Sequence, residues 1–135
     1  MNNNKTVLIL GANSDVAKEC IKHYVAKGFC VIAASRNTKM LNYFVEKYQI
    51  QDKVQVLFFD ANDFKTHQNF YRNLSLKPHI VIYAAGFLVQ NGKAFVDFES
   101  VFEMMKTNYA GAVSILNIIA MDKTNENLER IIGLS

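Results

Sequence analysis

Short apolar runs alternate with longer stretches of mixed character along the whole chain. The apolar runs predict buried strands at residues 7–10, 29–34, 54–59, 79–84 and 129–135. Between them, apolar residues recur at intervals of three and four, which is the spacing of one face of a helix. Helices are therefore predicted over residues 14–27, around residues 41–48, around residues 64–74 and over residues 99–121.

The same spacing predicts which face of each helix is buried. The buried positions are expected to be, in chain order, Val16, Cys20, Tyr24 and Val25; Leu41, Phe44, Val45 and Tyr48; Phe64, Gln68, Tyr71 and Leu74; and Val101, Met105, Tyr109, Ala112, Leu116 and Ile119. Gly28 stands where a C-terminal cap of the first helix is expected.

Strand and helix alternate from one end of the chain to the other, which predicts a parallel sheet with helices on both faces. A glycine turn after the first strand favours the doubly wound Rossmann type, an α/β fold with the strands in the order 3-2-1-4-5. We expect residues 1–135 to form a single dinucleotide-binding domain, without the C-terminal strands and helices that complete the larger versions of this fold. A ligand is expected across the carboxyl ends of the strands, at the switch between the first and fourth.

The stretch from Gly11 to Ala17 carries the strongest local signal. Gly11 ends the strand, Asn13, Ser14 and Asp15 are turn and N-cap residues, and Val16 opens the helical pattern. A tight turn into a helix points backbone N–H groups and the positive end of the helix dipole at one place. The turn is therefore a candidate phosphate site.

Ser35 and Arg36 follow the second strand, where side chains reach the ribose of a bound dinucleotide. A carboxylate here accepts hydrogen bonds from both ribose hydroxyls, whereas a guanidinium pairs with a 2′-phosphate. The pair favours NADP over NAD. The alternative interpretation of Arg36 is a solvated surface arginine.

Asp60 follows the third strand, and its carboxylate could accept from the amino group of adenine. The alternative is a turn or N-cap residue, although Asp63 is the better placed N-cap. The small residues Ala84, Ala85 and Gly86 follow the fourth strand and would let the backbone approach a ribose and nicotinamide closely. Tight packing at a turn explains them equally well.

Five short motifs occur in order along the chain. They are Leu10-Gly11-Ala-Asn-Ser-Asp15-Val-Ala17, Asp60-Ala61, Tyr83-Ala84-Ala85-Gly86, Asn108-Tyr-Ala-Gly111 and Ile131-Ile-Gly-Leu-Ser135. Together they resemble the N-terminal half of the short-chain dehydrogenase/reductase family. The resemblance implies an NADP(H)-dependent oxidoreductase acting on a carbonyl or secondary alcohol. It also implies that Asn108 helps to hold a proton-relay water, that Ser135 lies on the approach to the catalytic serine, and that two copies pair through the long helix.

The chain departs from the family pattern at two places. Asp15 replaces the second glycine of the turn, and its carboxylate is repelled by a pyrophosphate unless it turns away, for example as an N-cap. The family's Tyr-x-x-x-Lys pair lies on the helix after strand five, beyond the end of this sequence, and in the long helix Lys106 and Tyr109 occur in the wrong order. We expect these 135 residues to be inactive alone. The alternatives are a non-catalytic dinucleotide-binding module and a Rossmann-like interaction domain that binds no cofactor.

Composition narrows the range of functions. The net charge is only +3 and the basic residues are scattered, so we predict neither nucleic-acid binding nor a membrane-surface role. No apolar run reaches the length of a membrane span, and the N-terminus lacks the apolar region of a signal peptide, so we predict a cytoplasmic protein. Cys20 and Cys30 are expected to be buried free thiols, and no metal site is predicted. An unpaired edge on the fifth strand and an uncovered face on the long helix predict self-association, through residues around Met105, Tyr109, Val113 and Leu116 or through that edge.

Overall fold

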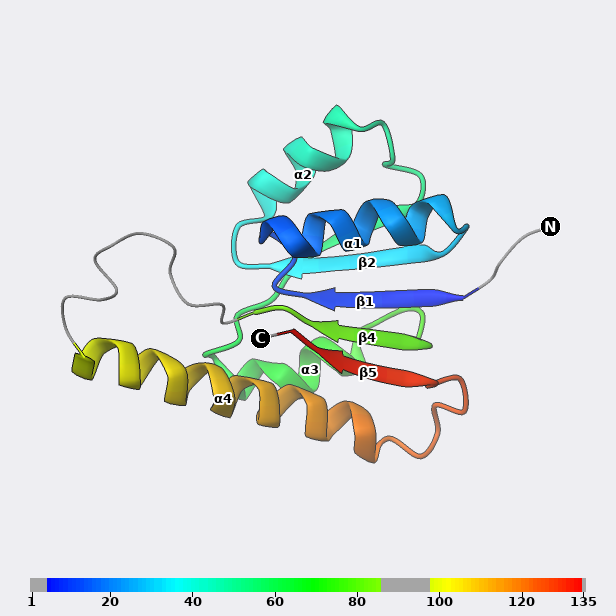
Figure 1. Ribbon diagram of the computed structural model, residues 1–135. Helices are drawn as coiled ribbons and strands as arrows, with labels where there is room; N and C mark the ends of the chain where they lie inside the picture. The colour runs from blue at the N-terminus through cyan, green and yellow to red at the C-terminus, as the bar shows by residue number, and fades with distance from the viewer. Residues whose placement is uncertain (1–4, 86–97, 135) are drawn as a thin grey trace.

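A computed structural model describes residues 5–85 and 98–134 of the chain. Its five strands lie parallel in one sheet, in the order β3-β2-β1-β4-β5 (Figure 1). The predicted doubly wound order is therefore confirmed. The strands are β1 (Thr6–Leu10), β2 (Cys30–Ser35), β3 (Val54–Phe58), β4 (Ile80–Tyr83) and β5 (Arg130–Gly133).

Helices cover both faces of the sheet. One face carries α1 (Asp15–Ala26) and α2 (Thr38–Lys47), and the other carries α3 (His67–Arg72) and α4 (Phe98–Met121), as Figure 1 shows. A short 3-10 helix, η1 (Phe64–Thr66), leads into α3. The molecule is thus three layers thick, with the sheet in the middle.

Strand β1 explains why the apolar runs are continuous rather than alternating. Its five residues are all buried, because neighbouring strands pair with it on both sides and helices cover both of its faces. Val7 and Ile9 join the core beneath α1 and α2, whereas Leu8 and Leu10 join the core beneath α3 and α4. Each face of a central parallel strand needs its own apolar side chains, so every position along β1 is apolar or buried.

The ends of α1 follow from side-chain caps. Ser14, not Asp15, is the N-cap: its backbone is extended and its hydroxyl accepts a hydrogen bond from the Ala17 N–H at 3.1 Å. The expectation that Asp15 serves as the N-cap is wrong, because the residue before it already fills that position. Asp15 lies in the first helical turn, where a carboxylate is favoured by the helix dipole. The predicted cap at Gly28 is confirmed by its positive φ of 89°.

All four predicted helix faces are partly wrong. Val16 in α1 is 51% exposed, because the face of α1 that packs on the sheet carries Ala17 and Ile21 instead. Tyr48, at the C-terminal end of α2, is 43% exposed.

In α4 the fully buried apolar residues are Ile115 and Ile119, while Met105 and Tyr109 are 55% and 73% exposed. The first half of α4 extends beyond the carboxyl ends of the strands, so its apolar residues have no core to enter (Figure 1).

In the third helical segment, His67, Tyr71 and Leu74 are buried, whereas Phe64 and Gln68 are exposed. The 3-10 turn of η1 rotates Phe64 away from the face that an uninterrupted α-helix would present. The apolar spacing was right for Tyr71 and Leu74, which lie in or just after α3 itself.

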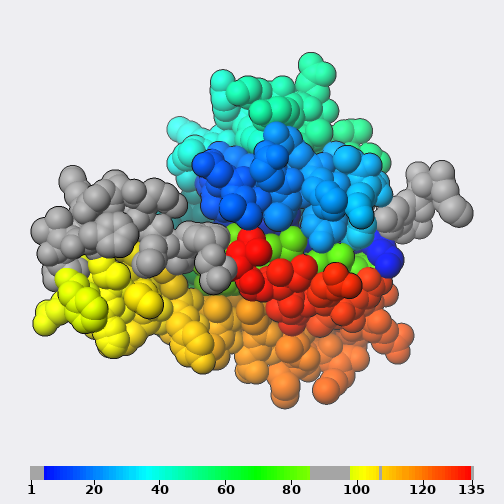
Figure 2. Space-filling view, in the orientation of Figure 1, coloured from blue at the N-terminus to red at the C-terminus, as the bar shows by residue number. Residues whose placement is uncertain are grey.

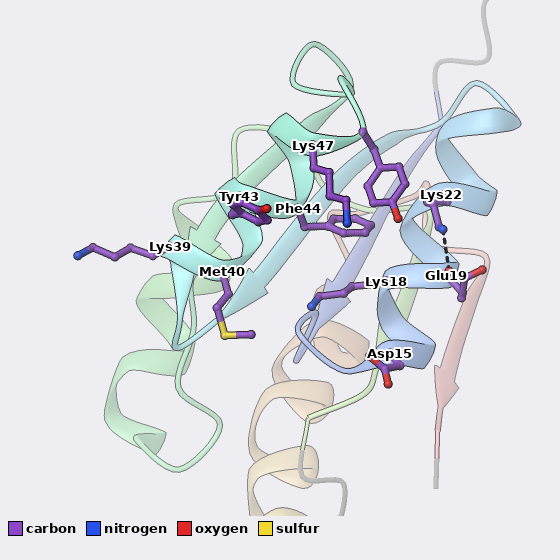
Figure 3. A pocket seen from close by; sticks show the side chains of 10 residues that line it. Asp15, Lys18, Glu19, Lys22, Lys39, Met40, Tyr43, Phe44 and Lys47 are labelled. Carbon is purple, nitrogen blue, oxygen red and sulfur yellow. Dashed lines mark ion pairs between the residues drawn. The ribbon is translucent and has the colours of Figure 1, made fainter.

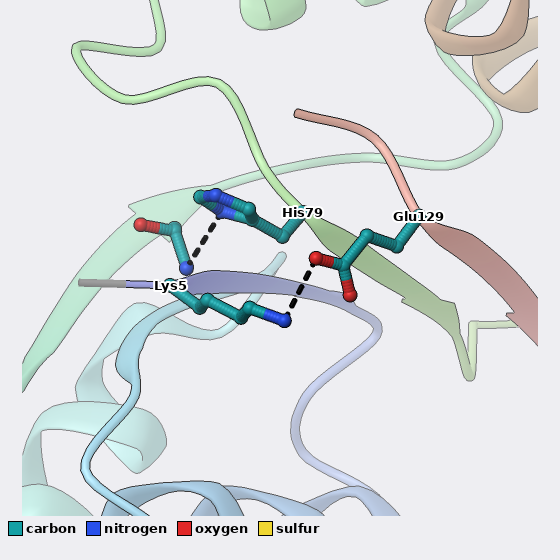
Figure 4. Close-up of polar contacts among 4 residues, drawn as sticks. Lys5, His79 and Glu129 are labelled. Carbon is teal, nitrogen blue, oxygen red and sulfur yellow. Dashed lines mark hydrogen bonds and ion pairs between the residues drawn. The ribbon is translucent and has the colours of Figure 1, made fainter. Parts of the chain in front are cut away.

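The amino ends of three strands are tied together on the edge of the sheet shown in Figure 4. The His79 N–H donates to the Thr6 carbonyl at 2.9 Å, and the Thr6 N–H donates to Nδ1 of His79 at 3.1 Å. Beside them, the Lys5 ammonium lies 2.8 Å from a carboxylate oxygen of Glu129. These contacts join the start of β1 to β4 and to the residue that precedes β5.

The ion pair predicts a pH-dependent contribution to stability. The hydrogen bond from Lys5 lowers the pKa of the Glu129 carboxyl. A lowered folded-state pKa stabilises the fold above the unfolded value of about 4.3, and this stabilisation is lost as the pH falls through the folded value. Glu129→Gln should therefore lower the melting temperature slightly at pH 7, with the difference from the parent vanishing in acid. A difference that stays constant from pH 7 to pH 3 in thermal unfolding would contradict this.

Candidate functional site

The carboxyl ends of β1 and β4 touch at Gly11 and Ala85. Gly11 has a φ of +82°, and a Cβ built on it would lie 2.3 Å from the Ala85 nitrogen and 2.4 Å from the Ala85 Cα. Only glycine combines this backbone conformation with this closeness. The N–H groups of Gly11 and Ala12 both donate to the Ala34 carbonyl, at 2.8 and 3.0 Å. The turn after β1 is thus locked to the ends of both neighbouring strands.

The first turn of α1 leaves two backbone donors available. The Ser14 hydroxyl occupies the Ala17 N–H, but the N–H groups of Asp15 and Val16 have no hydrogen-bond partner among the described residues. The side chains of Asp15 and Val16 are exposed. These two N–H groups lie at the positive end of the helix dipole, which is the arrangement that binds an anion.

Asn13 joins the turn after β1 to the end of β2. Its Nδ2 donates to the Ser35 hydroxyl oxygen at 2.7 Å and to the Asn37 carbonyl at 3.0 Å. Because a carbonyl can only accept, the nitrogen of the amide must face Asn37. The Oδ1 of Asn13 is then buried without a hydrogen-bond partner among the described residues. A buried acceptor without a donor is costly, so this atom is a candidate acceptor for a donor on a ligand.

Ser35, whose hydroxyl accepts from Asn13, is followed in sequence by Arg36. The Ser35 oxygen also accepts from the Asn37 N–H at 3.1 Å, so its own hydroxyl hydrogen is left to donate elsewhere. Ser35 is 6% exposed. Arg36 is exposed, and no carboxylate among the described residues lies within ion-pair distance of it. A hydroxyl donor and an unpaired guanidinium therefore adjoin the end of β2.

The turn after β3 is organised by Asp60. Its Oδ1 accepts from the Asn62 N–H at 2.9 Å, which is the turn role that the sequence allowed. The other carboxylate oxygen has no hydrogen-bond partner among the described residues, so a ligand could still reach it. Asp63 occupies the N-cap position of η1, as predicted, although its side chain makes no capping hydrogen bond.

Asn108 of α4 lies next to the carboxyl end of β4. Ala84 is buried and donates its N–H to the Leu10 carbonyl at 2.7 Å, and the Tyr83 hydroxyl donates to the Asn108 carbonyl at 3.4 Å. Burial raises the pKa of Tyr83 to about 12, so this hydroxyl remains protonated and is a donor rather than a base. Gly86 and Ser135, which the sequence also singled out, lie outside the described residues.

Comparison with known proteins identifies the family of the chain. The family model of the short chain dehydrogenases matches residues 5–132. The chain belongs to the short-chain dehydrogenase family.

Solved structures share the fold of this short-chain dehydrogenase at low sequence identity. Serine dehydrogenase from Escherichia coli is 20% identical, with a TM-score of 0.78 over 95% of this chain and 60% of its own. A short-chain dehydrogenase/reductase from Vibrio parahaemolyticus is 17% identical, with a TM-score of 0.75 over 93% of this chain and 56% of its own.

An actinorhodin polyketide ketoreductase determined with NADPH is 14% identical, with a TM-score of 0.79 over 98% of this chain and 54% of its own. The present chain therefore spans somewhat more than half the length of these three proteins. A search of curated proteins found no match.

Other site classes find no support in residues 5–85 and 98–134. No helix there is long and apolar enough to cross a bilayer, and no group of three or more histidine, cysteine, aspartate or glutamate side chains could hold a metal ion. Cys20 and Cys30 are free thiols, as predicted, and both are partly rather than fully buried.

A Tyr-x-x-x-Lys spacing also occurs within this sequence, at Tyr43 and Lys47. Both lie on α2 and line a hollow of about 550 Å³ between α1 and α2 (Figure 3). Helix α2 packs on β2 and β3, whereas Asn108 lies on α4 next to Tyr83 of β4. Spacing alone therefore does not make this pair the family's catalytic pair, because it lies on the wrong helix and on the other face of the sheet.

Sequence reasoning also missed His67. It is fully buried, with Nε2 at 2.9 Å from the Asp60 carbonyl oxygen and Nδ1 at 2.7 Å from the Ser114 hydroxyl. A single histidine in a short amphipathic segment carries no signal for such contacts, since its partners come from another turn and another helix.

Gly11→Ala tests the contact at the switch point. The added Cβ would meet the Ala85 backbone, and alanine is strained at a φ of +82°. The loss of stability should be about 3 kcal/mol or more, the sum of left-handed strain and overpacking. Denaturant unfolding measures it, with Gly133→Ala as the control because a Cβ there meets no atom within 4 Å. Equal stability of the two variants would show that the β1 and β4 ends do not touch as described.

Proposed function

We propose that this chain is the cofactor-binding part of an NADP(H)-dependent oxidoreductase that acts on a carbonyl or secondary alcohol. The observation that carries the proposal is the buried, partnerless Oδ1 of Asn13, which lies between the anion-binding turn of α1 and the Ser35–Arg36 pair. An acceptor in that position fits a ribose hydroxyl flanked by phosphates on both sides.

The donors and acceptors of the site fit the parts of NADP one by one. The N–H groups of Asp15 and Val16 suit the pyrophosphate, and Asn13 Oδ1 suits a ribose hydroxyl. The open carboxylate oxygen of Asp60 suits the adenine amino group, with Ala61 beside it. Ala84 and Ala85, followed in sequence by Gly86, leave room for the nicotinamide ribose.

Asp15 is compatible with this arrangement. Its side chain is exposed in the first helical turn, so the carboxylate can point into solvent while its backbone N–H faces the phosphate. The like charge still weakens pyrophosphate binding relative to a glycine at this position.

The end of β2 supports NADP rather than NAD. NAD recognition in this fold uses an acidic side chain on the ribose hydroxyls, and here the two residues are Ser35 and Arg36. The guanidinium has no carboxylate partner among the described residues, and the Ser35 hydroxyl has a hydrogen to donate. Two proteins of similar fold were determined with NADPH, which is consistent with this choice.

When bound, NADPH supplies the hydride for reduction of a carbonyl. The part of the chain described here binds and orients that cofactor, and Asn108 is proposed to hold a water near the reacting group. Ser135 is proposed to lie on the substrate side. The substrate-binding and proton-transfer groups are proposed to lie in the part of the family fold that the matched structures have and this chain does not span. The cytoplasmic location remains a prediction.

Arg36→Ala tests the choice of cofactor. Removing a hydrogen-bonded charge should weaken NADPH binding by about 10- to 100-fold and NADH binding hardly at all, because only NADPH carries the 2′-phosphate. Fluorescence titration of each reduced cofactor measures this. Arg72→Ala, which removes an exposed arginine at the end of α3, is the matched control and should change neither affinity. Equal weakening of NADPH and NADH by Arg36→Ala would refute the 2′-phosphate assignment.

We also propose that two copies of the chain pair through α4. One stripe of that helix exposes large apolar side chains at intervals of four and three: Phe98 (80% exposed), Phe102 (44%), Met105 (55%), Tyr109 (73%) and Val113 (49%). Such a stripe resembles the seam by which two helices pack. The edge strand β5, red in Figure 2, lies at the surface beside α4 and offers a second contact area, where Ile131 is 37% exposed.

Light scattering on size-exclusion chromatography tests this pairing. The parent chain should elute as a dimer at micromolar concentration, and Tyr109→Glu should shift it to a monomer because a carboxylate cannot be buried unpaired in the seam. Tyr43→Glu is the control, since Tyr43 is similarly exposed, at 67%, but lies on α2. A parent that is monomeric, or a dimer that Tyr109→Glu leaves intact, would rule out α4 as the contact.

A further inference from the structure

His67 is a buried polar residue that the proposed function does not use. Its exposed fraction is 0%, and both ring nitrogens have partners. The Asp60 carbonyl can only accept, so Nε2 must carry the proton and donate to it at 2.9 Å. In the neutral ring Nδ1 is then an acceptor, and the Ser114 hydroxyl donates to it at 2.7 Å. The contact with Asp60 fixes the direction of the Nε2 hydrogen bond, and the neutral ring then fixes that of the Nδ1 hydrogen bond.

Ring packing holds the imidazole in this orientation. His67 stacks on Phe59 with ring centroids 4.9 Å apart and planes inclined by 27°. Phe64 meets it edge-on, with centroids 5.9 Å apart. Phe59 is the residue after β3, so the ring is fixed against the strand whose end carries Asp60. Rotation of the imidazole would break two hydrogen bonds and this stacking together.

Helix α4 approaches the same turn very closely. A Cβ built on Gly111 would lie 2.6 Å from the Ala61 carbonyl oxygen and 3.1 Å from the Tyr83 hydroxyl. Ser114 lies three residues further along α4 and Asn108 three residues earlier, so all three positions fall on neighbouring turns of one face. That face meets Tyr83, Ala61 and His67 in turn. The helix that carries Asn108 is therefore seated directly on the turn that carries Asp60.

We propose that His67 and Ser114 are positioning residues for the adenine end of the site. Their hydrogen bonds fix the position of the Asp60–Ala61 turn relative to α4, the helix that also carries Asn108. The turn's own hydrogen bonds, from Asn62 and Asp63 to Asp60, shape it locally but do not attach it to the helix. The role at adenine rests on the proposed dinucleotide function, whereas the link between turn and helix stands on the contacts themselves.

Adenosine 5′-monophosphate is the probe, because it contains adenine but neither nicotinamide nor the 2′-phosphate. Ser114→Ala and His67→Phe should each weaken its binding about 3- to 10-fold, the effect of one or two neutral hydrogen bonds. The double variant should bind no more weakly than the weaker single variant, because both changes break the same link. Asn117→Ala, an exposed position on the next turn of α4, is the control and should bind like the parent. Calorimetry measures all five affinities.

A second set of measurements separates positioning from a loss of stability. The ratio of NADP⁺ to NAD⁺ affinity should stay constant in Ser114→Ala, since Ser35 and Arg36 are untouched. In the ligand-free protein, amide exchange at Asn62 and Asp63 should quicken in Ser114→Ala, and the nitrogen shifts of His67 in the parent should report the Nε2–H tautomer.

Each outcome decides between the two proposals. If the parent binds adenosine 5′-monophosphate and both variants bind it with the same affinity, the positioning role is overturned and the dinucleotide function stands. Failure of the parent to bind adenosine 5′-monophosphate would overturn the dinucleotide function and the adenine role together. The link between the Asp60–Ala61 turn and α4 would be overturned by an Nδ1–H tautomer of His67. It would also be overturned if Ser114→Ala left amide exchange at Asn62 and Asp63 unchanged.

Discussion

The contact between Gly11 and Ala85 is the constraint on which the rest of the structure depends. It brings the ends of β1 and β4 together at the point where the chain switches from one half of the sheet to the other. A side chain at residue 11 would push these ends apart, and the sheet between them would lose the pairing of its most buried strand. The small residues that follow β4 are required for the same reason. The site lies at this point because a crevice forms where the crossovers diverge to the two faces of the sheet.

The chemistry of the site depends on which backbone groups are hydrogen-bonded within the fold and which are not. The Ala34 carbonyl takes the N–H groups of Gly11 and Ala12, and the Ser14 hydroxyl takes that of Ala17. The N–H groups of Asp15 and Val16 remain, at the positive end of α1. The Nδ2 of Asn13 donates to the Ser35 hydroxyl in β2 and to the Asn37 carbonyl after it, and its Oδ1 is a buried acceptor without a partner among the described residues. A site with two free donors and one free acceptor side by side is suited to a phosphate joined to a sugar.

Helix α4 serves two surfaces at once. Its second half buries Ile115 and Ile119 against the sheet, and its Gly111 and Ser114 meet the turn after β3 and His67. Its first half lies beyond the sheet and exposes an apolar stripe. Because one helix carries both, a partner on the stripe and a ligand near Asp60, as proposed above, would contact the same element. Loop, helix and exposed stripe are therefore mechanically connected in this fold.

The sequence by itself determined the strands and their parallel order, and from that order it predicted where a site would lie. A central parallel strand must be apolar on both faces, so residues 7–10 could be identified from composition alone, and Gly11 after them indicated the switch point. The residues at the strand ends followed from that order, since parallel strands end at one edge. The family motifs pointed to the same edge, and the family is confirmed.

The tertiary structure decided what depends on neighbours distant in the sequence. Met105 and Tyr109 fit the helical spacing of α4 as well as Ile115 and Ile119 do, and only the extent of the sheet determines which pair is buried. The roles of Ser14 and Asp15 depended on a difference of one residue in where α1 begins. His67 finds Ser114 across 47 residues, a contact that no local pattern encodes. Periodicity specifies which residues can be buried together, but the surface that buries them exists only once the chain has folded.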